Sequence, residues 1–294
     1  MRARFPGAGA VRAAASGWTV QPWRLRVVPL GLDAPAAAPG LAGLRVAFVA
    51  DLHLRHPDRG VAPRIERALR AIRPDLVLVG GDTHDRPRWT SAAVEHLARY
   101  RAPLGTLVVP GNHEHRGGVD VAAFGRALAE RGVRLLLNET VEVPVARGAL
   151  RVVGVDDPAT RHHDLDRALA GVPADGFRLL LAHSGVILPE AEARGIPLVL
   201  SGHTHGGQVR LPWIGPPWLP RRAGPLVRGL RSANGTTLFV TSGAGTSILP
   251  VRWDCPPEVV SLSWSTSGGA TSAPKWCGSN GSPGEATVGG IRVA

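Results

Sequence analysis

The chain has 294 residues, of which 44% are hydrophobic and 19% are charged, values that fit a folded globular protein and exclude a disordered, collagen-like or coiled-coil chain. Its net charge is +11, and every lysine or arginine except Lys275 is an arginine. This bias indicates either a GC-rich genome, which we favour, or a nucleic-acid partner, since arginine pairs readily with phosphate.

The N-terminal segment, residues 1–17, is basic and rich in small residues. It lacks the leucine-rich stretch of a signal peptide, and no apolar run reaches the roughly 18 residues of a membrane-spanning helix. We therefore predict a disordered extension on a soluble, cytoplasmic protein. Residues 18–32 form a strand candidate at a sheet edge, because Pro22 and Pro29 disfavour a central position.

Short, apolar, β-branched runs recur from residue 45 onward and predict buried strands. They cover residues 45–50, 75–80, 106–110, 150–155, 178–182, 197–201 and 237–241, with a further strand at 258–264. Helical spacing appears between some of them, in residues 61–73, 91–101 and 119–132. The alternation of strand and helix predicts an α/β protein with layered architecture.

Two stretches lack such periodicity. Residues 209–232 contain five prolines and two tryptophans, which predicts a long loop. Residues 265–294 are rich in Ser, Gly, Thr, Ala and Pro, and we expect this tail to be disordered. The predicted organisation is therefore one domain over residues 18–264 between two disordered ends.

Clusters of His, Asp and Asn follow the predicted strands directly, where α/β sheets place their ligands. They are D-L-H at 51–53, G-D at 81–82, G-N-H-E at 111–114, a single His183, and G-H-T-H-G-G at 202–207. Each cluster alone is a weak signal. Together they offer oxygen and imidazole donors, which suit Mn²⁺, Fe or Zn²⁺. The two cysteines, Cys255 and Cys277, are too few for a thiolate metal cluster.

The order of these motifs resembles the calcineurin-like metallophosphoesterase superfamily. The G-H-T-H-G-G-Q run, G-V-D-D at 154–157 and S-G-A-G-T-S-I-L-P-V-R-W-D-C-P-P-E at 242–258 are similar to its bacterial YkuE-like branch. The resemblance extends from about Trp18 to Trp264 and implies a layered α/β/β/α sandwich. Members of this branch are often membrane-associated, and related enzymes cleave the pyrophosphate of UDP-diacylglucosamine.

The resemblance also implies two divalent metal ions, with manganese expected and iron or zinc as alternatives. The implied ligands are Asp51, His53 and His205 for one ion, Asn112, His183 and His203 for the other, and a bridging Asp82. Such a pair of ions ionises a shared water near neutral pH for in-line attack on phosphorus. His113 is the implied general acid, oriented by Glu114.

Substrate contacts are expected from the 209–232 segment, because it is joined directly to Gly207 and Gln208. The candidates are Arg210, Trp213, Trp218, Arg221 and Arg222. A Pro-rich surface crossover with no substrate role explains the same residues equally well.

The remaining histidines have structural interpretations. His84 departs from the aliphatic residue usual in this branch, and we interpret it as a helix cap, with a role facing the site as the alternative. Solvated loops or helix faces are predicted for His56, His96, His115, His162 and His163. Cys255 is predicted to be a small buried residue, because no histidine is suggested near it that would make it a nucleophile.

The sequence therefore predicts a dinuclear phosphoesterase or pyrophosphatase that acts through a metal-bound hydroxide. Its substrate is a phosphate-containing small molecule or a nucleotide-linked lipid such as UDP-diacylglucosamine, with peripheral contact to the inner face of an anionic membrane as a further expectation. The alternatives are an inactive scaffold of the same fold and a nuclease. No nucleic-acid-binding motif supports a nucleic-acid partner, and the oligomeric state is left open.

Overall fold

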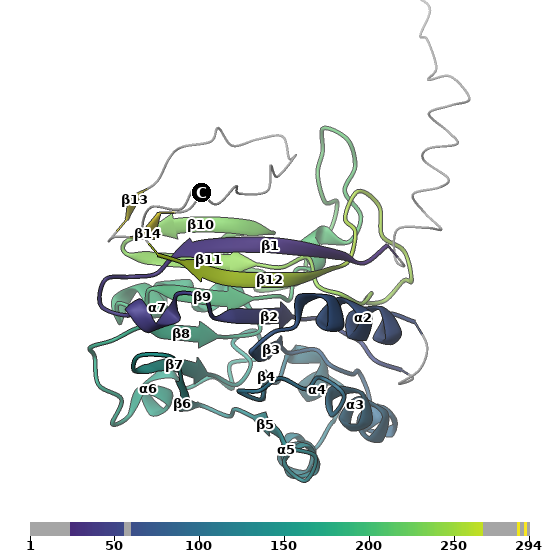
Figure 1. The fold of residues 1–294 in the computed structure, drawn as a ribbon. Helices are drawn as coiled ribbons and strands as arrows, with labels where there is room; N and C mark the ends of the chain where they lie inside the picture. Colours follow the sequence, from purple (N-terminus) through teal and green to yellow (C-terminus); the bar gives the residue numbers. More distant parts are fainter. Residues whose placement is uncertain (1–23, 56–59, 267–286, 289–290, 293–294) are drawn as a thin grey trace, which may run out of the picture.

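Two six-stranded sheets form the centre of the molecule. The computed structural model describes residues 24–55, 60–266, 287–288 and 291–292. The order of strands in the first sheet is β1 (Arg26–Asp33), β12 (Glu258–Ser265), β2 (Arg45–Val49), β3 (Leu76–Gly80), β4 (Thr106–Val109) and β5 (Val133–Leu135). The order in the second is β10 (Gly229–Ala233), β11 (Thr236–Val240), β9 (Leu198–Ser201), β8 (Arg178–Leu181), β7 (Ala149–Gly154) and β6 (Glu139–Pro144). Both sheets are visible in Figure 1.

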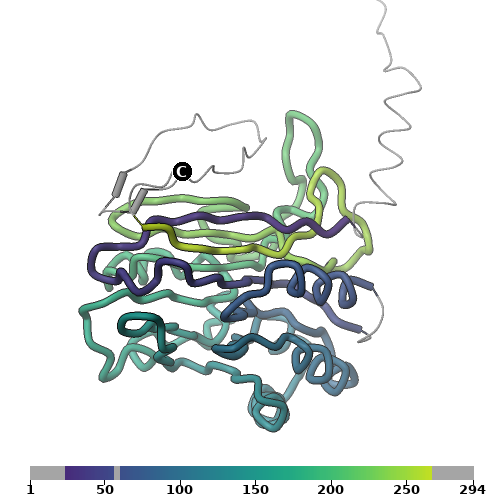
Figure 2. Tube along the Cα trace, in the orientation of Figure 1, coloured from purple at the N-terminus to yellow at the C-terminus, as the bar shows by residue number. Residues whose placement is uncertain are grey.

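Helices cover the outer face of each sheet. Against the first sheet pack α2 (Ala62–Ile72), α3 (Thr90–Leu97) and α5 (Val121–Ala129), while α6 (Leu165–Leu169) and α7 (Leu188–Ala193) pack against the second. Short 3₁₀ helices lie at η2 (Pro39–Leu41), η3 (Pro87–Trp89), η4 (Gly185–Ile187) and η5 (His205–Gly207), and α4 spans Asn112–Arg116. The predicted α/β/β/α sandwich is confirmed, and the chain trace in Figure 2 follows the same layers.

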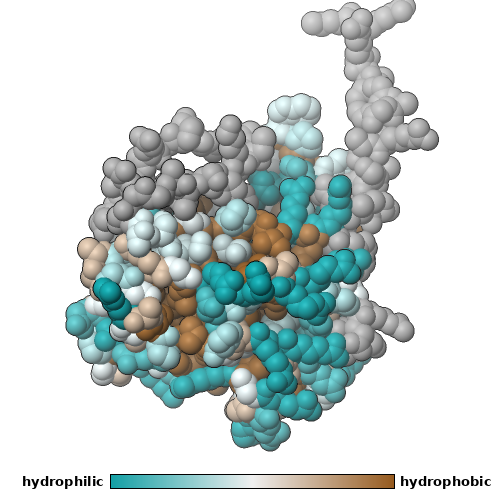
Figure 3. All heavy atoms as spheres, viewed as in Figure 1, coloured by the Kyte–Doolittle hydropathy of each residue, from teal (hydrophilic) through white to brown (hydrophobic). Residues whose placement is uncertain are grey.

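The continuous apolar runs of the sequence have a simple cause, because both faces of each sheet are buried. In β2, Val46 and Phe48 pack between the two sheets, whereas Ala47 and Val49 pack under the helices. Successive side chains of a strand point to opposite faces, so every position must be apolar. In the view of Figure 3, hydrophilic side chains gather over α2, α3 and α5, the solvent side of the helical layer.

The predicted strands and helices are found at the expected places. The edge strand also forms, as β1 from Arg26 onward, and it pairs in parallel with β12. The loop predicted over 209–232 is wrong at its end, because residues from Gly229 onward enter β10 and pair antiparallel with β11. This run of small and polar residues carries no apolar alternation, and its strand is formed by pairing rather than by pattern.

Several short elements escaped the sequence analysis: β5, β6, α4, α6 and α7 each span three to six residues. Of the chain ends, residues 1–23 and most of the 265–294 tail lie outside the described residues. Within the tail, β13 (Thr287–Val288) pairs antiparallel with β14 (Ile291–Arg292). In the described part of the chain, no helix has the length and apolar character that crossing a bilayer requires.

Strand direction determines where the polar clusters meet. In the first sheet β2, β3 and β4 run parallel, and in the second β7, β8, β9 and β11 do. The carboxyl ends of parallel strands lie along one edge of a sheet, where α/β proteins bind ligands. The clusters that follow these strands are therefore brought to one edge of the sandwich.

Candidate dinuclear metal centre

Seven polar side chains converge at this edge, and they are the ones that the sequence motifs predict. Asp51 and His53 follow β2, Asp82 follows β3, Asn112 begins α4 after β4, His183 follows β8, and His203 and His205 follow β9. All seven are buried. Buried acids and imidazoles need partners, since an isolated buried charge is costly.

The backbone at this edge is unusually strained. Asp51, His53, Asp82, His203 and His205 all have positive φ values, between 45° and 72°. Residues other than glycine rarely adopt this conformation, which costs about 1–3 kcal/mol each and persists where the surrounding structure enforces it. Its concentration in one place marks a functional site rather than an ordinary set of turns.

Asp82 lies at the centre of two groups of potential ligand atoms. It shares one group with Asp51, His53 and His205 and another with His183 and His203, and within each group the atoms lie within 4.8 Å of one another. Asn112 joins the second group, because its Oδ1 lies 3.3 Å from Nε2 of His183. One carboxylate shared by two donor sets is the arrangement expected of a dinuclear site.

In three of the imidazoles, the ring nitrogen on the side away from the cluster, here called the outer nitrogen, has a hydrogen-bond acceptor. Nδ1 of His53 lies 2.5 Å from Oδ1 of Asp85, Nδ1 of His183 lies 2.8 Å from the Gly80 carbonyl, and Nε2 of His203 lies 2.9 Å from the Arg221 carbonyl. When these outer nitrogens donate, the inner nitrogens offer lone pairs to the cluster, as metal-binding histidines do. The donor set therefore fits divalent metal ions.

The electrostatics of the cluster are those of a crowded, dry site. Burial raises the pKa of Asp51 to about 6, and burial lowers the pKa of His203 to about 4. Burial alone would raise the pKa of Asp82, but the neighbouring His183 outweighs it and holds that pKa well below the usual value. Buried carboxylates need positive charge close by to offset the cost of burial, and divalent cations bound in the cluster would supply it.

His113 is the most accessible imidazole at this edge, with a side chain that is 33% exposed, and its Nε2 lies 4.0 Å from Oδ2 of Asp82. Its Nδ1 lies 3.0 Å from Oδ1 of Asp85. Burial lowers the pKa of His113, but the hydrogen bond to Asp85 and the charge of Asp82 have a larger effect in the opposite direction. The pKa of His113 therefore lies above its ordinary value. A raised pKa keeps the imidazole protonated, as a general acid requires.

The predicted orientation of His113 by Glu114 is wrong. Glu114 is fully buried, and its Oε1 accepts hydrogen bonds from the main-chain N–H and the hydroxyl of Thr83 at 2.6 and 2.7 Å. Its Oε2 accepts one from the Gly111 N–H at 2.9 Å. Glu114 therefore joins the two loops that hold Asp82 and Asn112, and Asp85 contacts His113 instead. The G-D-x-x-D spacing of Asp82 and Asp85 is the sequence signal that could have pointed to this residue.

Two other histidines, His84 and His96, lie in different surroundings than the sequence predicts. His84 is fully buried, and its ring contacts the hydroxyls of Thr83 and Thr90. Among the described residues it belongs to no group of potential ligand atoms, and it does not cap η3 or α3, which begin without a side-chain cap. His96 is fully buried against Tyr100 and is not solvated.

No metal-binding group among the described residues includes the remaining candidates. His115 pairs with Asp156 at 2.6 Å, and His163 pairs with Glu190 at 2.9 Å. The ring of His162 stacks on that of His115. His56 lies outside the described residues.

The 209–232 segment contacts the site through its backbone. The Arg221 carbonyl accepts from His203, and the Arg222 carbonyl accepts from Ser184 Oγ at 2.7 Å. The side chains of Arg221 and Arg222 are exposed, and Arg210 is half-buried. Trp213 and Trp218 are 95% and 60% exposed at the tip of the segment. The segment thus contacts the ring of His203 through its backbone and presents two aromatic rings to solvent.

Arg252 is a site residue that sequence reasoning missed. Its guanidinium is fully buried and donates to the carbonyls of Ser242 and Gly245 at 2.8 and 2.6 Å. The same group lies 3.5 Å from the ring of His205. Cys255 is buried, as predicted, and its thiol lies 3.1 Å from the His205 carbonyl. Both residues fix the loop that carries His205.

Comparison with known proteins shows the family to which the chain belongs. The family model for calcineurin-like phosphoesterases matches residues 44–207. The uncharacterised metallophosphoesterase YkuE of Bacillus subtilis is 28% identical over 75% of this chain and 78% of its own length. The phosphodiesterase YaeI of Escherichia coli is 30% identical over 75% of this chain and 82% of its own.

The matched span contains all seven converging side chains together with His113. The chain therefore belongs to the calcineurin-like phosphoesterase family of metal-dependent phosphoester hydrolases.

Proposed function

We propose that the protein is a dinuclear phosphodiesterase or pyrophosphatase. The observation that supports this most directly is the position of Asp82 within both groups of donor atoms. Asp51, His53 and His205 hold the first cation with Asp82, and Asn112, His183 and His203 hold the second. Divalent cations bound there supply Lewis acidity at phosphorus and lower the pKa of a bound water. Manganese is the cation we propose, with iron or zinc as alternatives.

The protein's own groups then perform two tasks. The buried carboxylates and imidazoles fix a dry site in which the phosphoryl group of the substrate is oriented. His113 holds a proton at Nε2, facing the cluster, and donates it to the departing oxygen. Asp85 orients the His113 ring through Nδ1.

The test is hydrolysis of bis(p-nitrophenyl) phosphate by the Mn²⁺-loaded protein together with its metal content. Asp82→Asn should lose metal and activity, whereas Asp120→Asn, which removes an exposed helix-capping carboxylate of α5, should retain both. If Asp82→Asn keeps two metal ions and wild-type kcat, the dinuclear assignment is wrong. Metal binding without turnover would support the alternative of an inactive scaffold.

We further propose that the substrate has an apolar part and that the enzyme works at the surface of an anionic membrane, with a nucleotide-linked lipid as the substrate class. Trp213 and Trp218 support this, since tryptophan favours the headgroup region. Ile248 and Leu249 extend the exposed apolar surface at 73% and 63% exposure. Gln208 bridges the two loops, because its side-chain amide contacts the carbonyls of Ser247 and Leu249.

A nuclease remains the second candidate only through the net charge of +11. Cationic surfaces give salt-dependent affinity for nucleic acids. Cleavage of single- or double-stranded DNA that equals the turnover of a nucleotide-linked lipid would favour the nuclease.

A further inference from the structure

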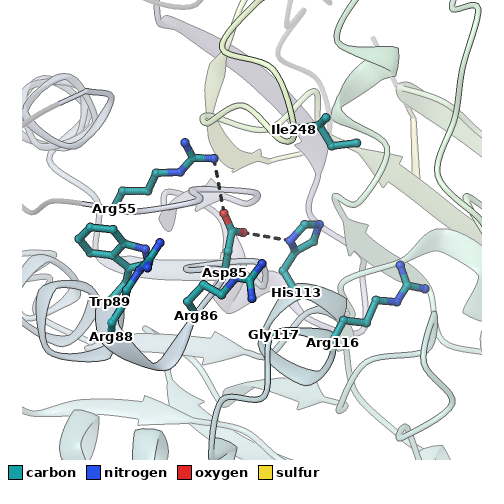
Figure 4. A pocket seen from close by; sticks show the side chains of 9 residues that line it. All are labelled: Arg55, Asp85, Arg86, Arg88, Trp89, His113, Arg116, Gly117 and Ile248. Atoms are coloured by element: carbon teal, nitrogen blue, oxygen red, sulfur yellow. Dashed lines mark ion pairs between the residues drawn. The ribbon is translucent and has the colours of Figure 1, made fainter.

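A concave surface, which we call the arginine pocket, lies beside the proposed metal centre. It has a volume of about 600 Å³, and its walls include Arg86, Arg88 and Arg116 together with the ring of His113. Figure 4 shows these side chains around a common space. A cavity of this size is typical of small-molecule sites. Because His113 lines the pocket and its Nε2 faces Asp82, a group that leaves the metal centre towards His113 enters the pocket.

The charge of the arginine pocket selects for anions. Four arginines and a single carboxylate, Asp85, line it, which gives a net charge of +3 with histidine neutral. The carboxylate is already engaged by His53 and His113 and lies 3.9 Å from Arg55. In the part of the chain that the structure describes, Arg86, Arg88 and Arg116 form no ion pair. These guanidinium groups are therefore available to an anionic ligand.

Local packing places the arginines around the pocket. Arg86 and Arg88 flank the start of η3, where the Arg88 guanidinium lies over the Trp89 ring at 5.2 Å from its centroid. Such a cation–π contact restrains a flexible side chain. Arg116 ends α4, and the next residue, Gly117, packs so closely that a Cβ there would overlap the Asp85 carbonyl. The end of α4 and the segment before η3 are thus held side by side.

We propose that the arginine pocket binds a phosphate carried by the leaving group, so that the preferred substrate is a pyrophosphate diester. This inference rests on the proposed function, because it places the reacting phosphorus over Asp82 and the second phosphate among the arginines. Guanidinium groups bind phosphate through paired, charge-assisted hydrogen bonds. A leaving group that carries no phosphate, such as an aryl alcohol, forms no such hydrogen bonds with these arginines.

The reaction balances with water as the only co-reactant. The oxygen of water bonds to the phosphorus at the metal centre while the bond from that phosphorus to the bridging oxygen breaks. The electron pair of that bond passes to the bridging oxygen, which takes the proton from Nε2 of His113. The products are two phosphomonoesters, one of which departs through the arginine pocket. The proton released from water restores the charge of His113.

The experiment compares two probes on the Mn²⁺-loaded full chain: P1,P2-di(adenosine-5′) diphosphate and bis(p-nitrophenyl) phosphate. The variant combines Arg86→Ala, Arg88→Ala and Arg116→Ala. We expect the ratio of kcat/KM for the pyrophosphate to kcat/KM for the aryl diester to fall about 100-fold, the loss expected when charged hydrogen bonds to phosphate are removed. The corresponding triple lysine variant should fall less, because it keeps the charge but loses the paired geometry, and it replaces the alanine variant if that fails to fold.

A matched control removes three exposed arginines that do not line the pocket, through Arg131→Ala, Arg147→Ala and Arg167→Ala. If the control lowers the ratio equally, net charge is responsible and the proposal is wrong. A wild-type protein that cleaves the aryl diester but not the pyrophosphate also overturns it, while leaving the proposed phosphodiesterase function intact. If neither probe is cleaved, the proposed function itself fails. Weakened sedimentation with phosphatidylglycerol vesicles at an unchanged ratio would assign the arginines to a membrane instead.

Discussion

Oδ1 of Asp85 lies 3.0 Å from Nδ1 of His113, and this contact gives the proposed general acid its orientation. The same oxygen lies 2.5 Å from Nδ1 of His53, a proposed metal ligand. One carboxylate therefore contacts both the proposed acid and a proposed ligand of the first cation. Its own pKa is far below the usual value, because the hydrogen bonds from His113 and His53 outweigh the effect of its burial.

Replacing Asp85 by Asn should lower kcat about 10- to 100-fold, the usual effect of losing a residue that hydrogen-bonds to a metal ligand.

His113→Ala should lower kcat by roughly 10² to 10⁴, as for other general acids. Both losses should shrink with p-nitrophenol as the leaving group, which needs little protonation, and steady-state kinetics on alkyl and aryl esters will measure this. Equal losses for both leaving groups in His113→Ala would remove this residue from the acid role.

Glu114→Gln provides a contrast. Since Glu114 accepts hydrogen bonds from Thr83 and Gly111 and has none to His113, its replacement should lower the melting temperature and the metal content together. The dependence on the leaving group should stay that of the wild type. A Glu114→Gln protein with normal stability but the kinetic signature of His113→Ala would restore the original role of Glu114.

Glycine positions that touch the acidic ligands give a steric test of the site. A Cβ at Gly243 would lie 2.6 Å from Oδ2 of Asp51, and Gly243 has a φ of 69°. Gly243→Ala should therefore weaken binding of the first cation, measured by metal titration. Gly148→Ala is the matched control, since its φ is 87° but nothing lies within 4 Å of the added Cβ. If the two variants bind metal equally, backbone strain alone accounts for any loss of stability.

Arg252→Met should destabilise the fold by about 3 kcal/mol, because it leaves the carbonyls of Ser242 and Gly245 buried and without their charged donor. Urea unfolding of the metal-free protein measures this without interference from metal binding. Arg147→Met, at an exposed arginine, should change the free energy of unfolding by less than about 0.5 kcal/mol. A small effect for Arg252→Met would show that its contacts are not needed for the loop that carries His205.

The pair of His115 and Asp156 should make stability depend on pH. Burial lowers the pKa of His115, but the hydrogen bond to Asp156 raises it more, so the folded pKa lies above the ordinary 6.5. The stabilisation is therefore fully present below about pH 6.5 and is lost as the pH rises through the folded pKa. The difference in unfolding free energy between the wild type and His115→Gln should shrink across that window. A difference that grows with pH would contradict the assignment.

Trp213→Ala combined with Trp218→Ala should weaken sedimentation with anionic vesicles and raise KM for a lipid-linked pyrophosphate. The kcat for a small aryl ester should change little, because the two rings lie far out on the loop, as their exposure indicates. Val27→Ala, at another exposed apolar residue, is the control. Unchanged vesicle binding in the double variant would reduce the 209–232 segment to a structural crossover.

The sequence predicted the fold and the cluster well for a physical reason. Strands buried on both faces must be apolar throughout, so β2, β3 and β9 stand out, and the polar residues that end them mark the site. Asp51, Asp82 and His203 each lie two residues after the end of their strand, and sheet geometry brings them together.

The predictions that failed concern contacts that the pattern of apolar and polar residues in the sequence does not encode. Glu114 follows His113 in the sequence, yet it is Asp85 that contacts the His113 ring in the folded protein, while Glu114 accepts hydrogen bonds from the backbone of Thr83 and Gly111. Arg252 looks like a surface residue in the sequence, but its carbonyl partners come from a loop of irregular backbone. β10 forms because β11 offers it an edge, and nothing in its own residues requires a strand.

The order of strands in the first sheet has a consequence for biosynthesis. β12 lies between β1 and β2, so the first strand that the structure describes pairs with the last long strand of the domain. On the ribosome, β1 and one edge of β2 have no partner until residues 258–265 emerge, well after every proposed metal ligand has been synthesised. Arg252, which braces the loop of His205, also arrives only at that stage. The first sheet therefore stays incomplete through most of translation. A metal ion that bound early would bind while this sheet still lacked β12.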